Sequence, residues 1–219
     1  MTIKLYAHPF SSYCQKALIA FYENDVPFEF VMLDGSEPVA SEFAKLWPIK
    51  RFPLLVEGER VVPEATMIIE YLAVHHPGSV KLIPDDADVA IEVRMLDRFF
   101  DNYVMNAQSR VVFNALREEA RRDPQGVEEA LAMLDNAYGV LDRWMETREW
   151  AAGGAFSLAD CAAAPALLYA DWTHPIPEKF ANVWAYRRRL LARPSYARAL
   201  DEARPFREYF PLGAPVGRD

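Results

Sequence analysis

Residues 51–66 have the sequence RFPLLVEGERVVPEAT, which holds two strand-like runs and the beginning of a helix. The runs LLV and RVV are joined by EGE, and glycine in so short a connection is typical of a β-hairpin. Apolar side chains then recur at helical spacing over residues 65–75. The stretch therefore predicts two antiparallel strands followed by a helix.

The residues before this hairpin predict a strand, a helix and a second strand. Residues 3–7 form a short apolar run, and a helical pattern begins near Ser12 and ends before Pro27. In residues 28–32 large apolar and other side chains alternate, as expected of a strand, and a short helix is expected near residues 39–46. The predicted order is βαβ, α, ββ, α.

A change of pattern follows this α/β part. Residues 78–86, GSVKLIPDD, contain Gly, Pro and paired aspartates with little periodicity, and every strong pattern after them is helical. We therefore predict a domain over residues 1–77, a linker over 78–86 and an all-helical domain over 87–219. The stripe expected on the first long helix of this domain consists of Val89, Val93, Leu96, Phe100 and Tyr103.

Composition excludes several classes of function. The net charge is -8 and the sequence pI is about 5.1, which disfavours binding to nucleic acid or to an anionic membrane. The one basic run, residues 187–189, is interpreted as a solvated helix face. Cys14 and Cys161 fit neither a disulfide framework nor a metal site. With no leader-like start or membrane span, we expect a soluble cytoplasmic protein without a metal.

Several short motifs stand in an order that resembles the cytosolic glutathione transferase family. They are a strand ending near Tyr6, a loop with Ser11, Phe52-Pro53, Glu64-Ala65-Thr66 and a helix start at residues 157–160. The resemblance spans nearly the whole chain and is closest to serine-using, bacterial-like members, with the class left open. It implies a thioredoxin-like N-terminal domain, βαβ-α-ββα, followed by an all-α C-terminal domain.

The resemblance changes the interpretation of Pro53. From the sequence alone a trans bond is favoured, because only about 5–6% of X–Pro bonds in folded proteins are cis. In the family the matching proline is cis. The residue before it, here Phe52, pairs its backbone with the cysteinyl unit of glutathione.

Ser11 has two interpretations. A serine directly before a helix is a good N-cap. The resemblance implies that the Ser11 hydroxyl also contacts the glutathione sulfur and stabilises its thiolate, since Lys16 follows at the family spacing. Tyr6 is the alternative donor, because other classes use a tyrosine at the end of the first strand.

The resemblance also assigns the two ends of glutathione. Glu64 is expected to bind the ammonium of the γ-glutamyl unit, and the Ala65 N–H is expected to bind the carboxylate of the same unit. Family members usually carry a serine or threonine at the position of Ala65, so one hydrogen bond is missing unless Thr66 or a water replaces it. Lys50 and Arg51 match positions near the glycyl carboxylate.

The implied function is that of an enzyme, a glutathione transferase that joins glutathione to a hydrophobic electrophile in detoxification. Glutathione is then a substrate, and a homodimer is implied. The electrophile is expected beside the first long helix, at Tyr103, Met105, Asn106 and Phe113. The alternatives are a weakly catalytic or non-catalytic glutathione-binding regulator of the same fold, a glutathione-dependent isomerase or dehalogenase, and a thiol-disulfide reductase, against which serine at position 11 argues.

Overall fold

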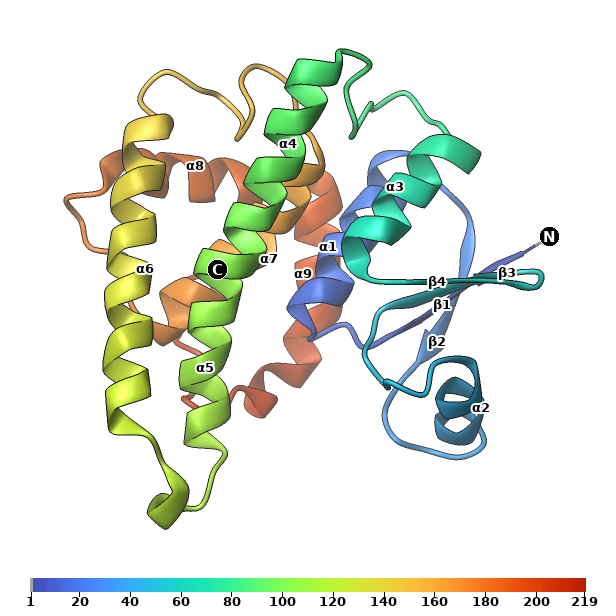
Figure 1. Cartoon of the computed structure of the whole chain (residues 1–219), viewed down its shortest axis with the longest axis horizontal. Coiled ribbons are helices and arrows are strands. Elements are labelled where there is room, and N and C mark those ends of the chain that lie inside the picture. Colours follow the sequence, from blue (N-terminus) through green and yellow to red (C-terminus); the bar gives the residue numbers. More distant parts are fainter. Residues whose placement is uncertain (1) are drawn as a thin grey trace.

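The computed structural model describes residues 2–219 and contains a four-stranded mixed sheet in the order β2-β1-β3-β4 (Figure 1). β1 pairs in parallel with β2, whereas the other two pairings are antiparallel. The predicted βαβ-α-ββα order is confirmed. The strands are β1 (Ile3–Ala7), β2 (Phe28–Met32), β3 (Leu54–Glu57) and β4 (Arg60–Pro63).

Helices cover both faces of this sheet. α1 (Ser12–Glu23) and α3 (Ala65–His75) pack on one face, where Leu5 and Leu55 join the main core. α2 (Val39–Leu46) covers the other face, where its Phe43 contacts Tyr6 and Leu54 in a separate small core. Alternate residues of each strand therefore point to different cores.

The rest of the chain is helical and surrounds α7, whose side chains are almost all buried (Figure 1). α7 begins with the predicted capping box, in which Ser157 and Asp160 bond each other's backbone. The buried Asp160 carboxylate also accepts from the Tyr186 hydroxyl at 2.6 Å. The helices are α4 (Ala87–Phe99), α5 (Asn106–Ala115), α6 (Pro124–Trp144), α7 (Leu158–Thr173), α8 (Ala181–Leu191) and α9 (Pro194–Ala203).

A π-helical segment, Phe100–Met105, joins α4 to α5. Its wider turn changes the direction of the side chains within it, so the stripe expected from an uninterrupted α-helix is wrong at Tyr103. The expected stripe is also wrong at Val89, near the start of α4, which is exposed. Tyr103 is 49% exposed, whereas Met105 is 3% exposed and belongs to the core.

The basic run at residues 187–189 is not wholly a solvated face, and that interpretation is wrong for Arg187. Its guanidinium is buried and lies 3.2 Å from a carboxylate oxygen of Asp171, which is fully buried. Arg218 also donates to Asp171, so this carboxylate joins α8 and the C-terminal residues to α7.

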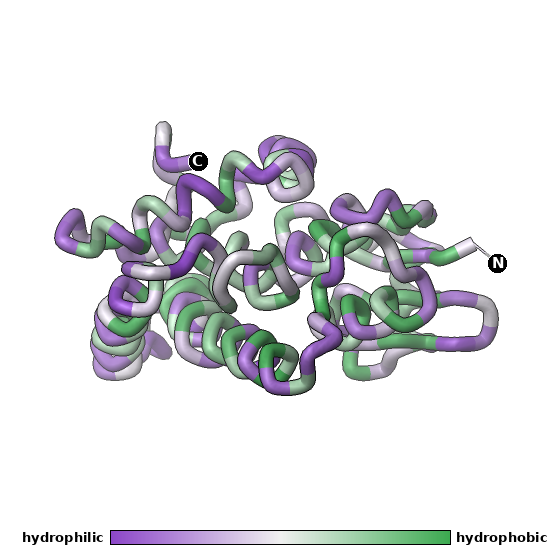
Figure 2. The backbone as a smooth tube through the Cα atoms, turned by 90° about the horizontal axis from the view of Figure 1, so that it is seen from above, coloured by the Kyte–Doolittle hydropathy of each residue, from purple (hydrophilic) through white to green (hydrophobic). Residues whose placement is uncertain are grey.

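The α/β part and the helical part meet along α1, which packs against α7 and α9. In the view from above, the N-terminus lies on the sheet side and the C-terminus on the helical side (Figure 2). Residues 76–86 contain no helix or strand, and the domain division in this region stays a prediction. Within residues 2–219, no helix is both long and apolar enough to cross a membrane.

Candidate functional site

A cavity of about 720 Å³ opens between the end of the sheet and the helical part. One side of the cavity consists of the β1–α1 loop, the turn before β3 and the start of α3. The other side consists of α5, α7 and the C-terminal residues. The α/β side consists of Phe10, Ser11, Ser12, Tyr13, Lys50, Arg51, Phe52, Pro53, Glu64 and Ala65. The helical side consists of Gln108, Ser109, Val112, Phe113, Leu116, Tyr169, Tyr209, Phe210 and Pro211.

Ser11 lies in this cavity at the N-terminus of α1. It is the N-cap, and its Oγ accepts the Cys14 N–H at 3.4 Å. A hydroxyl has one proton to donate besides its acceptor lone pairs, so capping leaves the Ser11 O–H available to a ligand. The first turn of α1 has no acidic residue that would offset the positive end of the helix dipole. The position thus suits a developing anion.

Cys14 is not a second reactive group on the cavity surface. Its side chain is fully buried, and burial raises the pKa of the Cys14 thiol to about 12. It packs as a small apolar residue behind Ser11. Among residues 2–219, no group of three His, Cys, Asp or Glu side chains is arranged to hold a metal ion.

The structure does not bring Tyr6 to the cavity. Its side chain points to the α2 face of the sheet, and its hydroxyl donates to Glu42 Oε1 at 2.6 Å. Burial and the Glu42 carboxylate raise the pKa of Tyr6. The tyrosine hydroxyl is therefore already bonded on the side of the sheet away from Ser11.

The peptide bond between Phe52 and Pro53 is cis, as the resemblance predicts. Strand pairing begins at Leu54, so the backbone groups of Phe52 lie outside the sheet ladder. Lys50 and Arg51 are exposed beside it and also line the cavity. The segment therefore presents the backbone of Phe52, which is outside the sheet ladder, with two adjacent cations.

The start of α3 combines an exposed carboxylate with an unusual backbone. Glu64 has φ 71° and ψ 125°, which is rare for a residue with a side chain. Such a conformation costs of order 1–3 kcal/mol and is often found at functional sites. Ala65, the first residue of the helix, is buried at the cavity edge.

The Thr66 hydroxyl is bonded elsewhere. It accepts from Lys16 Nζ at 3.0 Å and donates to Asp97 Oδ2 at 3.0 Å. Lys16 itself is buried between Asp97 and Asp101, at 2.6 and 2.8 Å. Thr66 therefore belongs to the contact between α1, α3 and α4, and does not replace the hydroxyl missing at Ala65.

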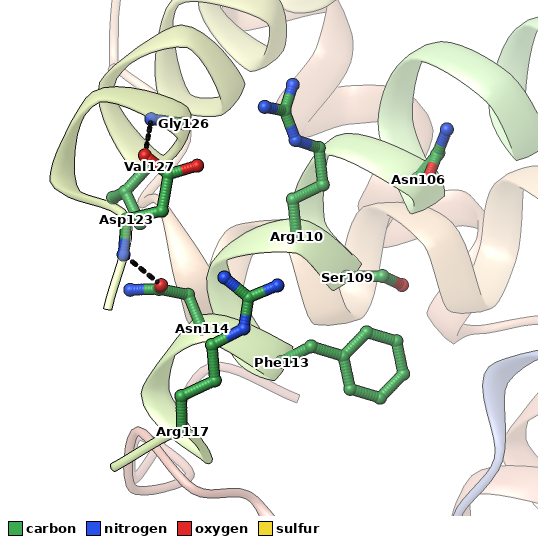
Figure 3. Close-up of a pocket in the computed structure, with 9 residues that line it drawn as sticks. All are labelled: Asn106, Ser109, Arg110, Phe113, Asn114, Arg117, Asp123, Gly126 and Val127. Carbon is green, nitrogen blue, oxygen red and sulfur yellow. Dashed lines mark hydrogen bonds between the residues drawn. The ribbon is translucent and has the colours of Figure 1, made fainter. Parts of the chain in front are cut away.

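Of the four residues expected at the electrophile pocket, the structure brings only Phe113 to the main cavity. Tyr103 points to solvent and Met105 points to the core, because both lie in the π-helical segment between α4 and α5. Asn106 lines a neighbouring cavity of about 180 Å³, which shares Ser109 and Phe113 with the main one. Figure 3 shows Ser109 and Phe113 pointing to one side of α5, whereas Asn114 and Asp123 lie on the opposite side of that helix.

Sequence reasoning missed most of the helical wall. Ser109, Val112 and Leu116 are at helical spacing with Phe113 along α5 and its C-cap, and this periodicity was a usable signal. Tyr169 and Phe210 come from distant parts of the chain. Nothing local in the sequence indicates that they meet Ser11 across the cavity.

Comparison with known proteins agrees with this geometry. The family model for the glutathione S-transferase N-terminal domain matches residues 5–80, and that for the C-terminal domain matches residues 104–194. A glutathione S-transferase from Silene vulgaris is 30% identical over 91% of this chain and 97% of its own. The chain belongs to the glutathione S-transferase family.

Solved glutathione S-transferases share the fold over nearly their whole length. The enzyme from Methylobacterium radiotolerans, in complex with glutathione sulfonate, has a TM-score of 0.78 and 25% identity, covering 91% of this chain and 94% of that one. The enzyme from Methylobacillus flagellatus, with glutathione bound, has a TM-score of 0.82 and 24% identity, covering 90% and 98%.

The backbone of Glu64 gives a prediction about stability. Glu64→Gly and Glu64→Ala both remove the carboxylate, but only glycine adopts the positive φ without strain. We expect the glycine variant to be more stable than the alanine variant by about 1 kcal/mol. Thermal unfolding of the two purified proteins measures the difference.

Glu70, within α3, supplies the matched control. There the backbone is helical, so Glu70→Gly should be less stable than Glu70→Ala by about 1 kcal/mol. If Glu64→Gly is also less stable than Glu64→Ala, the backbone of this protein is not strained at position 64.

Proposed function

We propose that this protein is a glutathione transferase in which the Ser11 hydroxyl donates to the sulfur of bound glutathione. The observation that carries the proposal is the position of Ser11, which lines the cavity at the positive end of α1 and can donate its hydroxyl proton while its Oγ accepts the Cys14 N–H. The reaction needs a thiolate, because the thiol itself is a weak nucleophile.

The free energy required is within reach of this arrangement. Lowering a thiol pKa from about 8.5 by about 2 units takes roughly 2.7 kcal/mol. A hydrogen bond to a charged group contributes about 1.5–3 kcal/mol, and a helix N-terminus about 0.3–1 kcal/mol. Ser11 therefore acts as a hydrogen-bond donor and not as a base.

Glutathione is proposed to lie along the α/β side of the cavity. Its cysteinyl unit pairs with the backbone of Phe52, ahead of the cis Pro53. Glu64 binds the γ-glutamyl ammonium, and the Ala65 N–H, at the start of α3, binds the carboxylate of the same unit. The glycyl carboxylate meets Lys50 and Arg51.

The second substrate is proposed to be a hydrophobic electrophile held against the helical wall. Phe113, Tyr169 and Phe210 supply apolar and aromatic surface there. The thiolate attacks an electrophilic carbon, forms a carbon–sulfur bond, and the electron pair leaves with the displaced group or moves into the electrophile. Holding the two reactants together removes much of the entropic barrier.

The proposed setting is the reducing cytoplasm, with detoxification of reactive compounds as the role. One observation supports it. Cys14 and Cys161 are both free and buried. A reducing compartment keeps thiols in this state, and it is also where reduced glutathione is available as a substrate.

Replacing Ser11 tests the donor. Ser11→Ala should lower kcat/KM for conjugation of an aryl halide by roughly 10–100-fold at neutral pH, since it loses one hydrogen bond to a charged sulfur. Tyr6→Phe should keep most of the activity because Tyr6 bonds Glu42 on the other face of the sheet. The opposite pattern would show that Tyr6 is the donor. A wild-type protein that neither conjugates the aryl halide nor binds to immobilised glutathione would refute the proposed transferase activity.

The missing hydroxyl at Ala65 gives a gain-of-function prediction. Ala65→Ser restores a donor at the start of α3, where Thr66 is bonded to Asp97 and Lys16. A hydrogen bond to the γ-glutamyl carboxylate contributes about 1.5–3 kcal/mol, so Kd for glutathione should fall by about tenfold or more. Isothermal titration measures it. An unchanged Kd would place the γ-glutamyl unit away from Ala65.

We also propose that two copies of the chain associate through α3 and α4. Glu70 and Arg94 join these helices by a 2.6 Å hydrogen bond at the surface. Four exposed apolar residues lie close to this pair: three are three or four positions from Glu70 or Arg94 along their helices, and the fourth, Met95, is four positions after Ile91 on the same face of α4. They are Met67, Val74, Ile91 and Met95.

A charged residue on this surface should dissociate the proposed homodimer. Met95→Glu places two carboxylates in an apolar contact, and we expect sedimentation at low micromolar concentration to show a monomer. Val216→Glu, which changes an exposed apolar residue near the C-terminus, is the control and should remain dimeric. A wild-type monomer would refute the proposed association.

A further inference from the structure

Tyr169 connects the helical wall of the cavity to the loop that carries Ser11. It lies on α7, its ring is buried, and one side of it lines the cavity. Its hydroxyl donates to the backbone carbonyl of Phe10 at 2.7 Å. The same residue therefore contacts both the electrophile side of the cavity and the residue that precedes the proposed thiolate donor.

Gln15 and Tyr169 together form a polar clamp on this loop, in which their side chains hold the carbonyls of Pro9 and Phe10. The Gln15 Nε2 donates to the Tyr169 hydroxyl at 2.9 Å and to the Pro9 carbonyl at 3.0 Å. The amide is fully buried on α1. The carbonyls of Pro9 and Phe10, the two residues directly before Ser11, are thus both held by side chains from outside the loop.

The hydrogen bonds run in one direction, from the Gln15 amide to the Tyr169 hydroxyl and on to the Phe10 carbonyl. Bonds arranged in such a chain polarise and strengthen one another. The Phe10 ring adds an edge-on contact with Tyr169 at 5.5 Å between centroids. Both the backbone and the side chain of Phe10 are therefore fixed against α7.

The clamp is not needed to fill space or to balance a charge. A phenylalanine would occupy the same volume as Tyr169, so packing alone does not require the hydroxyl. The ionisable groups that act on this hydroxyl are Cys14 and Arg207, and burial raises its pKa, so Tyr169 stays neutral. The hydroxyl serves the loop as a donor.

We propose that Tyr169 is a positioning residue for glutathione activation: through Phe10 it holds the Ser11 hydroxyl at the place where the sulfur binds. This inference rests on the proposed role of Ser11. A hydrogen bond to sulfur depends on placement within a few tenths of an ångström, and a displacement of about 1 Å can reduce the rate by about 100-fold. Tyr169 acts through Ser11 and does not itself contact the reacting sulfur.

Tyr169→Phe tests the proposal, because it removes the hydroxyl and keeps the ring. We expect the pKa of the bound glutathione thiol, measured by ultraviolet absorbance of the thiolate, to rise by about one unit, which is about tenfold less thiolate at neutral pH. The pH profile of kcat/KM should shift by the same amount. KM for the electrophile should stay within about twofold, because the aromatic wall is retained.

Tyr138→Phe is the matched control. Tyr138 is a buried tyrosine on α6 that donates to the His174 carbonyl at 3.0 Å, away from the cavity. The Tyr138→Phe variant should lose about as much stability as the Tyr169→Phe variant and leave the pKa of the bound glutathione thiol unchanged. A shift of equal size in both variants would show that loss of stability, and not the clamp, moves the thiol pKa.

The Ser11→Ala background separates positioning from a direct effect. If Tyr169 acts through Ser11, adding Tyr169→Phe to Ser11→Ala should not raise the thiol pKa further, whereas independent effects would add. Gln15→Met removes both amide donors and should shift the thiol pKa in the same direction as Tyr169→Phe. It also serves as the test if Tyr169→Phe does not fold.

The results distinguish the inference from the proposed function. A wild-type protein whose bound glutathione has an ordinary thiol pKa would overturn both. A lowered thiol pKa that is unchanged by Tyr169→Phe and by Gln15→Met would overturn only the positioning role. A changed KM for the electrophile with an unchanged thiol pKa would make Tyr169 a cavity wall alone.

Discussion

The burial of Lys16 between two carboxylates is the interaction on which the arrangement of this protein depends. The ammonium of Lys16 is removed from water in the middle of α1 and lies 2.6 Å from Asp97 and 2.8 Å from Asp101, in the helical part. Removing one partner of a buried ion pair typically costs about 3–5 kcal/mol, because the other charge is left without compensation. α1 therefore has one position relative to α4, and its N-terminus, with Ser11, has one position relative to the cavity.

The sequence predicted what is encoded locally. Strand bounds, the hairpin and the extent of α3 follow from alternation, a turn glycine and helical periodicity over a few residues. The side of the sheet on which Tyr6 lies was also encoded: Leu5 faces α1, and side chains alternate along a strand, so Tyr6 faces α2. The resemblance to a family that uses tyrosine at this position obscured that signal.

The sequence did not predict features that depend on partners far along the chain. Arg187 is buried because Asp171 lies beneath it, and a run of three arginines gives no indication of that partner. Neither Tyr103 nor Met105 lies at the expected pocket, because a π-helical segment inserts a wider turn, which no simple periodicity anticipates. The meeting of Tyr169 with the Ser11 loop is of the same kind, since 159 positions separate it from Phe10.

The two ends of the proposed glutathione site differ in how well they are built. At the sulfur end, Ser11 caps a helix, and the carbonyls of the two residues before it are held by side chains from two elements. At the γ-glutamyl end, Glu64 has a strained backbone, Ala65 has no hydroxyl, and that of Thr66 is bonded to Asp97. Contacts to the γ-glutamyl unit are the same in the ground and transition states, so their loss raises KM, whereas stabilisation of the thiolate determines kcat. This division allows a transferase to tolerate alanine at position 65 where abundant glutathione compensates for weaker binding, while a less ordered Ser11 loop would impair the chemical step at any glutathione concentration.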